Sequence, residues 1–168
     1  QALGQTVPDP IKPGDEEIEK PYELDAIRGA KVLLIEDNVI NQKVVVGLLE
    51  SEQFVVDVAA DGQEGVDKYL ASARAPYDII LMDLQMPVMD GIAATRLIVQ
   101  NREFKVPPII AMTADAMSGV EKMVLDIGMK GYLTKPINIK KFFATLEKWI
   151  QPREGGPAEN SSTSNSST

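Results

Sequence analysis

Four ionisable residues stand where apolar runs of the sequence end. Glu36 and Asp37 follow the run KVLLI, Asp83 follows IILM, and Lys135 follows GYLT. Three carboxylates in one place repel one another, and a hard divalent cation with oxygen ligands, Mg²⁺, relieves that repulsion. A carboxylate beside Mg²⁺ and a lysine can accept a phosphoryl group, because both cations neutralise the added charge. These residue types predict metal-assisted phosphoryl transfer that depends on positioning and electrostatics, with no general base.

The elements that must position these residues are short apolar strands alternating with amphipathic helices. The apolar runs predict strands over residues 31–35, 54–59, 79–82, 109–112 and 131–134. The segments between and after them predict helices over residues 39–51, 63–73, 92–101, 117–127 and 139–150. Five strands alternating with five helices predict an α/β fold, a parallel sheet covered by helices on both faces. The strand ends then meet at one edge, where such sheets bind ligands.

Local signals support several of the predicted helices. Asn38 is a suitable N-cap for the first helix, in which Ile40, Val44 and Leu48 recur every four residues on one face. Gly128 suits the C-terminal end of the helix predicted over residues 117–127, whose apolar residues form a stripe at helical spacing.

Composition limits the remaining possibilities. The net charge is −8, with seven acids against three bases in residues 1–30 and sixteen against thirteen in residues 31–150. An acidic chain lacks the basic surface that nucleic-acid binding requires. The absence of cysteine and histidine excludes disulfides, thiol ligands, a histidine phosphodonor and histidine-ligated metals. No run is long enough to cross a membrane, so we expect a cytoplasmic domain without direct membrane contact, although a parent protein could be membrane-anchored.

The sequence divides into three parts. Residues 1–29 contain four prolines and an acidic cluster, which predicts a linker with a short helical turn near residues 23–27. Residues 30–151 hold the alternating pattern and form the predicted domain. Residues 152–168 are rich in Gly, Ser, Thr and Asn, which predicts a disordered polar tail.

The segment MDLQMPVMDG, residues 82–91, carries a resemblance to a known family. It resembles the phosphoacceptor segment of response-regulator receiver domains, with Asp83 in the phosphorylated position, and the resemblance extends over about residues 31–150. The resemblance implies a flavodoxin-like doubly wound five-stranded parallel sheet with strand order 2-1-3-4-5. It also implies that the domain takes part in a two-component phosphorelay.

The resemblance assigns roles to the residues at the predicted strand ends. Asp83 resembles the nucleophile and phosphoacceptor, and it also contributes to the metal site. Asp37 resembles the direct Mg²⁺ ligand, Glu36 the acid that holds metal-bound water, and the backbone carbonyl of Gln85 the remaining protein oxygen. Lys135 resembles the lysine that pairs with the phosphoryl group. Taken one at a time, Glu36 and Asp37 would equally suit helix caps.

Further roles concern switching and dephosphorylation. Thr113 resembles the hydroxyl residue that bonds a phosphoryl oxygen, and Tyr132 the aromatic residue that turns inward on phosphorylation. Gln85 and Asp115 lie at positions that flank the path of the attacking water in this family. The bond between Lys135 and the proline that follows it is often cis in the family. An N-cap role for Thr113 and ordinary strand packing for Tyr132 are the alternatives.

The segments EDNVINQKV and LMDLQMPVMDG resemble most the receivers of hybrid sensor histidine kinases. The expected partners are a histidine kinase domain as phosphodonor and a histidine phosphotransfer protein. We expect that protein to dock on the first helix, with Asn41 and Val45 exposed there; the surface of the fourth helix, fifth strand and fifth helix, which the switch at Tyr132 would alter, is the alternative. A stand-alone single-domain response regulator acting as a binding switch is one alternative. A flavodoxin-like flavin protein is another, although two acids replace the phosphate-binding loop that it would need after the first strand.

Overall fold

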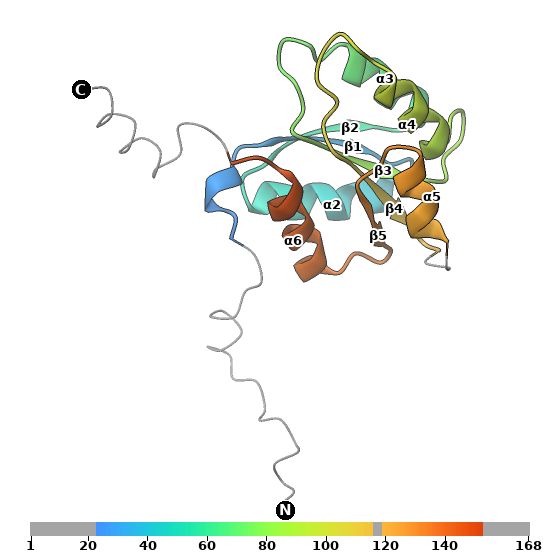
Figure 1. Ribbon diagram of the computed structural model, residues 1–168. Coiled ribbons are helices and arrows are strands. Elements are labelled where there is room, and N and C mark those ends of the chain that lie inside the picture. The colour runs from blue at the N-terminus through green and yellow to red at the C-terminus, as the bar shows by residue number, and fades with distance from the viewer. Residues whose placement is uncertain (1–22, 116–118, 153–168) are drawn as a thin grey trace, which may run out of the picture.

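The computed structural model describes residues 23–115 and 119–152. It contains a five-stranded parallel sheet in the order β2-β1-β3-β4-β5, which confirms the predicted winding (Figure 1). The strands are β1 (Lys31–Ile35), β2 (Val55–Ala59), β3 (Ile79–Asp83), β4 (Ile109–Thr113) and β5 (Gly131–Thr134). The helices are η1, a short 3-10 turn (Asp25–Ile27), α2 (Val39–Ser51), α3 (Gly62–Leu70), α4 (Gly91–Val99), α5 (Val120–Asp126) and α6 (Ile139–Trp149). Each predicted strand and helix exists, and no boundary shifts by more than three residues.

The sheet has helices on both faces because its strands are apolar on both faces. In β1, Val32 and Leu34 belong to the core cluster beneath α2 and α6, whereas Leu33 and Ile35 belong to the cluster beneath α3, α4 and α5. All residues of β3 and β4 are buried, as expected for central parallel strands. The central strands therefore hold their C-terminal residues rigidly at the sheet edge.

Side-chain caps start four helices just beyond strand ends. Asn38, Asp61, Asp90 and Asn138 each accept a hydrogen bond from the backbone N–H three residues later, at distances of 2.8–3.0 Å. Helix α5 ends at Asp126, and Gly128 follows its C-cap with a φ of 111°, in agreement with the prediction that Gly128 suits this end. Helix α2 ends in the same hydrogen-bonding pattern, but Gln53 occupies the left-handed position with a φ of 70°.

Helix α2 turns a different face to the sheet from the one its apolar spacing suggests. Val45 and Leu49 are buried, at 2% and 0% exposure, whereas Ile40 is 72% exposed and Val44 50%. The expectation that Val45 lies on an exposed docking surface is therefore wrong. The helix has apolar residues on more than one side, so spacing could not decide which side packs. An apolar strip of α2 remains open to solvent.

The lead-in to β1 packs against the domain. The helical turn predicted near residues 23–27 is present as η1, and Leu24 and Ile27 are buried in the core cluster beneath α2 and α6. Arg28 also bonds Glu52 at 2.7 Å. The packed part therefore begins by Leu24, upstream of the predicted linker boundary at residue 29, and the division into three parts stays a prediction. Residues 1–22, the start of the predicted 117–127 helix and residues 153–168 of the predicted tail lie outside the described residues.

In the described ranges, no helix combines the length and apolar character needed to cross a membrane.

Candidate functional site

The carboxylates predicted to act together lie at one edge of the sheet. One oxygen each from Glu36, Asp37 and Asp83 can be chosen so that all three lie within 4.8 Å of one another. They line a cavity of about 190 Å³ at the C-terminal ends of β1 and β3. Its other lining residues come from the start of α2 and the segments after β3, β4 and β5, and include Asn38, Asn41, Gln85, Thr113, Ala114 and Lys135. Parallel winding brings them together because every strand ends at this edge.

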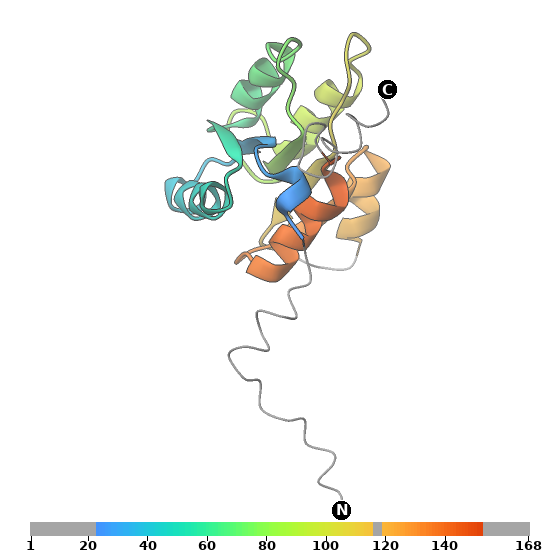
Figure 2. The ribbon, with the colours of Figure 1, turned by 90° about the vertical axis from the view of Figure 1, so that its left-hand side faces the viewer.

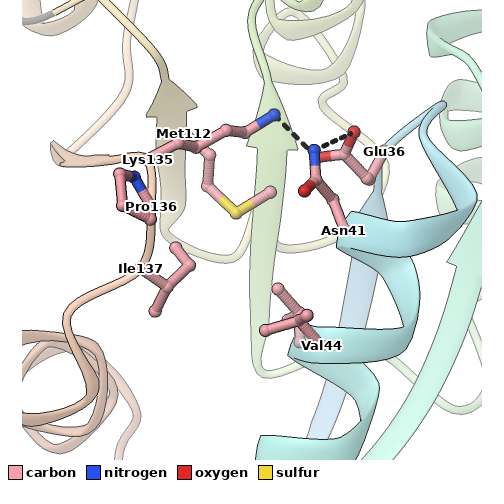
Figure 3. A pocket seen from close by; sticks show the side chains of 8 residues that line it. Glu36, Asn41, Val44, Met112, Lys135, Pro136 and Ile137 are labelled. Atoms are coloured by element: carbon pink, nitrogen blue, oxygen red, sulfur yellow. Dashed lines mark hydrogen bonds and ion pairs between the residues drawn. The ribbon is translucent and has the colours of Figure 1, made fainter.

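Lys135 joins two of the three carboxylates. Its Nζ lies 2.9 Å from Glu36 Oε1 and 3.3 Å from Asp83 Oδ2, and Figure 3 shows it extending toward Glu36 from the segment after β5. The Glu36 side chain is 1% exposed, so its charge requires this partner. Burial lowers the pKa of Lys135, but its bonds to Glu36 and Asp83 outweigh burial and raise the pKa above the usual value. Lys135 is therefore a fixed cation in the site.

Helix α2 positions Glu36 through contacts that sequence reasoning missed. Glu36 Oε2 accepts hydrogen bonds from the Asn38 backbone N–H at 3.0 Å and from Asn41 Nδ2 at 3.4 Å. Gln42 Nε2 donates to the Glu36 carbonyl at 2.6 Å. The signal was present in the segment EDNVINQKV, because two amides one turn into a helix point back toward the residues before its cap. The N-terminal turn of α2 thus fixes one carboxylate of the site.

Asp83 is held at the tip of β3. It is 6% exposed, and its Oδ1 accepts a hydrogen bond from the Gln85 backbone N–H at 3.2 Å. Burial raises the pKa of Asp83 from its usual 3.8 to about 6. The hydrogen bond from the Gln85 N–H lowers the pKa, the charge of Glu36 raises it further, and the charge of Lys135 lowers it. The ionised form is thus destabilised in the folded protein, which favours a bound cation beside it.

The other predicted residues are placed at different distances from this cavity. Thr113 is 5% exposed; its hydroxyl accepts from the Asp115 N–H at 3.0 Å and donates to the Asp115 carbonyl at 3.2 Å. Gln85 and Thr113 also line a neighbouring cavity of about 330 Å³ between the segment after β3 and α5, and Asp115 lines only that second cavity of the two. Tyr132 is half-buried against the core cluster beneath α3, α4 and α5, and it lines neither cavity. The peptide bond from Lys135 to Pro136 is cis, as predicted.

The donor set fits a hard divalent cation. Its side-chain oxygens are all carboxylate oxygens, one from a buried residue whose pKa is raised by burial, and the cluster is open to solvent through the exposed Asp37. Mg²⁺ prefers one or two carboxylates and keeps several waters, which an open cavity of this size accommodates. These residues can therefore hold a metal beside Asp83 and Lys135.

The sequence is similar to those of known receiver domains and response regulators. The sequence profile of the family described as "Response regulator receiver domain" matches residues 32–147. Hybrid signal transduction histidine kinase I of Dictyostelium discoideum is 41% identical over 124 residues, which cover 71% of this chain and 7% of that kinase. The polar-differentiation response regulator DivK of Brucella ovis is 34% identical over 119 residues, which cover 71% of this chain and 94% of DivK. The chain thus spans a small fraction of the kinase and nearly all of the regulator.

Solved structures give the same match. One match is the receiver domain of sensor histidine kinase PA1611 from Pseudomonas aeruginosa, which was solved with magnesium coordinated in its active-site cleft. It is 40% identical to this chain with a TM-score of 0.64, and the match covers 73% of this chain and 98% of that domain. The receiver domain of Ssk1 from Saccharomyces cerevisiae, solved in complex with the histidine phosphotransfer protein Ypd1, is 29% identical with a TM-score of 0.65. That match covers 73% of this chain and 90% of the other.

Proposed function

This chain belongs to the response regulator receiver domain family, the phosphoacceptor modules of two-component phosphorelays, and from that membership we propose that Asp83 is its phosphoacceptor. The observation that carries the proposal is the buried Asp83 carboxylate, 3.3 Å from Lys135 and grouped with Glu36 and Asp37. Membership also decides against the flavin-protein alternative. The reaction is transfer of a phosphoryl group from a phosphohistidine: the N–P bond breaks and a bond forms between phosphorus and a carboxylate oxygen of Asp83.

Each residue of the site contributes to that transfer by position and charge. Lys135 neutralises charge on the transferred group, because its Nζ already lies beside the Asp83 oxygen that faces it. Asp37 would bind Mg²⁺ directly, Glu36 would hold a metal-bound water, and Asp83 and the Gln85 carbonyl would complete the protein ligands. Bound Mg²⁺ supplies positive charge to the phosphoryl oxygens.

Thr113, Gln85 and Asp115, which line the neighbouring cavity, and Tyr132, which does not, are proposed to act after transfer. The Thr113 hydroxyl leaves its backbone partners at Asp115 to bond a phosphoryl oxygen, and Tyr132 then moves inward to fill the space. Two arrangements of one packed region that differ by a few kcal/mol form such a switch. Gln85 and Asp115 border the approach of water to the phosphorylated Asp83, and their side chains set the rate of its hydrolysis.

One experiment tests these assignments together. The protein is incubated with Mg²⁺ and a small-molecule phosphodonor, and intact-mass spectrometry follows the phosphoryl increment as it appears and decays. We expect the increment in the wild type and none in Asp83→Asn, with altered decay in Gln85→Ala and Asp115→Ala. Full phosphorylation of Asp83→Asn, with correct folding shown by circular dichroism, would refute the phosphoacceptor assignment. Unchanged decay would remove Gln85 and Asp115 from the mechanism.

The proposed parent protein is a hybrid sensor histidine kinase. The similarity to the kinase of Dictyostelium discoideum and to the PA1611 receiver supports this origin, whereas the length match to DivK is the observation behind a stand-alone regulator. The proposed partners are a histidine kinase domain and a histidine phosphotransfer protein. Val44 lines an apolar groove together with Pro136 and Ile137, next to Lys135 (Figure 3). The exposed strip of α2 at Ile40 and Val44 is the proposed docking surface. A partner seated there brings its histidine toward Asp83.

A further inference from the structure

A second cavity of the domain lies at the opposite end of the sheet from Asp83. It has a volume of about 390 Å³ and is formed where β3, β4 and β5 begin and α6 ends. None of its residues belongs to the proposed phosphoacceptor site. Its lining includes two lysines and four residues with apolar or aromatic side chains: Lys105, Lys130, Tyr77, Pro107, Pro108 and Trp149.

The chemistry of this cavity is apolar in its floor and positive at its rim. Two prolines, a tyrosine and the half-buried Trp149 form the floor. Lys105 and Lys130 are exposed, and neither side chain forms an ion pair with any residue in the described ranges. Lys148 Nζ lies 5.2 Å from the centre of the Trp149 ring and adds a third positive charge. Asp78, the one acid in the lining, already accepts the Lys31 backbone N–H at 2.8 Å.

The described start of the chain packs on the side of the domain where Trp149 lies. Trp149 packs against the same core cluster that contains Leu24 and Ile27. Figure 2 shows η1 lying alongside α6, the helix that ends at Trp149. The acidic cluster Asp15-Glu16-Glu17-Ile18-Glu19 lies four to eight residues before Glu23, within reach of about 28 Å of extended chain.

We propose that residues 15–19 dock into this cavity of the same chain. Four acids around one isoleucine match a positive rim around an apolar floor, with Ile18 against Trp149 and the carboxylates near Lys105 and Lys130. The sequence after residue 152 is a poorer match, because it carries two acids, one arginine and no large apolar residue. Docking fixes the direction in which the lead-in leaves the domain, on the side away from Asp83.

Trp149 is the only tryptophan of the chain, so its fluorescence reports on this cavity alone. In the full chain at low salt, acrylamide quenching is compared between wild type and a variant carrying Asp15→Asn, Glu16→Gln, Glu17→Gln and Glu19→Gln. We expect the quenching constant to rise about twofold in the variant, and equally in wild type at about 500 mM salt, because exposed ion pairs are weak and screened. Ile18→Ser and the pair Lys105→Glu, Lys130→Glu should each give the same rise.

Matched controls separate docking from general charge effects. The pair Lys43→Glu, Lys140→Glu changes the same charge at exposed positions on α2 and α6 and should leave quenching unchanged. Reversing the charge on both sides, with Asp15→Lys, Glu16→Lys, Glu17→Lys and Glu19→Lys combined with Lys105→Glu and Lys130→Glu, should restore the wild-type constant.

Two results would overturn the proposal. The first is a quenching constant that neither the acid-neutralising variant nor salt changes. The second is protection that disappears on dilution, which would show that the segment of a second copy, rather than the same chain, covers Trp149. Phosphorylation of Asp83 by a small-molecule donor is measured on the same samples and is independent of both outcomes.

Discussion

Replacing Asp83 by asparagine should stabilise the metal-free protein at neutral pH. Asp83 is 6% exposed, and burial raises its pKa from 3.8 to about 6, with Glu36 adding to the rise. Between these pH values the folded protein keeps a proton on Asp83 that the unfolded chain releases. Folding stability therefore falls as pH rises from 3.8 through about 6, and the whole cost is present above that range.

The size of the effect follows from the two pKa values. A tenfold change in acid strength corresponds to about 1.4 kcal/mol, so ionising Asp83 in the folded protein costs up to about 3 kcal/mol. Asparagine removes this cost, in which the attraction between Asp83 and Lys135 at 3.3 Å is already counted, and Lys135 keeps Glu36 at 2.9 Å. We expect a gain of up to about 3 kcal/mol, or up to about 12 °C in the melting temperature of a domain of this size.

The assay is urea unfolding followed by circular dichroism in the presence of a chelator. Wild type and Asp83→Asn are compared at about pH 7.5 and about pH 4, where the advantage of the variant should shrink toward zero. Saturating Mg²⁺ should stabilise the wild type and remove most of the difference at the higher pH, since it binds the folded carboxylates. Glu50→Gln, an exposed acid on α2, is the matched control and should change neither curve.

Two results would refute this reasoning. An Asp83→Asn variant that is no more stable than wild type at neutral pH would mean that burial does not destabilise the carboxylate. An advantage that persists undiminished at the lower pH would mean that the gain has a cause other than ionisation.

Two further predictions concern helix α2. Gln53→Gly should stabilise the protein by about 1 kcal/mol, because glycine adopts the φ of 70° without strain. Gly128→Ala, at a φ of 111°, should destabilise it by at least as much. Thermal unfolding measures both changes, and a destabilised Gln53→Gly would contradict the argument. Ile40→Lys and Val44→Lys should slow phosphoryl transfer from a histidine phosphotransfer domain of the same phosphorelay at least about tenfold, because a buried charge at an interface is costly. Leu97→Lys and Tyr132→Ala should leave the transfer rate unchanged. Normal transfer in the α2 variants with loss in Tyr132→Ala would place docking elsewhere.

Local sequence was sufficient for the order and type of the elements. The apolar runs at residues 31–35 and 131–134 are strands with the predicted bounds, and the helix predicted over residues 39–51 begins and ends as expected. Strands buried on both faces need continuous apolar runs, and helix starts need a capping side chain such as Asn38, so both leave local signals. The helix predicted over residues 63–73 instead ends at Leu70, where a turn held by Ser72 follows.

The grouping of the candidate site also followed from sequence. Glu36, Asp83 and Lys135 each end a strand, and parallel winding brings such residues to one edge whatever their separation along the chain. Asn41 and Gln42 were missed as supports of Glu36 although their place one turn into the helix was a signal, because an amide there can also face solvent and packing decides between the two.

Tertiary structure alone decided which surfaces are buried. The apolar residues of α2 are spread around the helix, so the buried pair Val45 and Leu49 and the exposed Ile40 were fixed by how α2 packs on the sheet. The pKa of Asp83 depends on how completely neighbouring elements exclude water from it, which no spacing encodes. The cavity around Trp149 likewise joins segments from residue 77 to residue 149, because packing brings together residues that the chain keeps far apart.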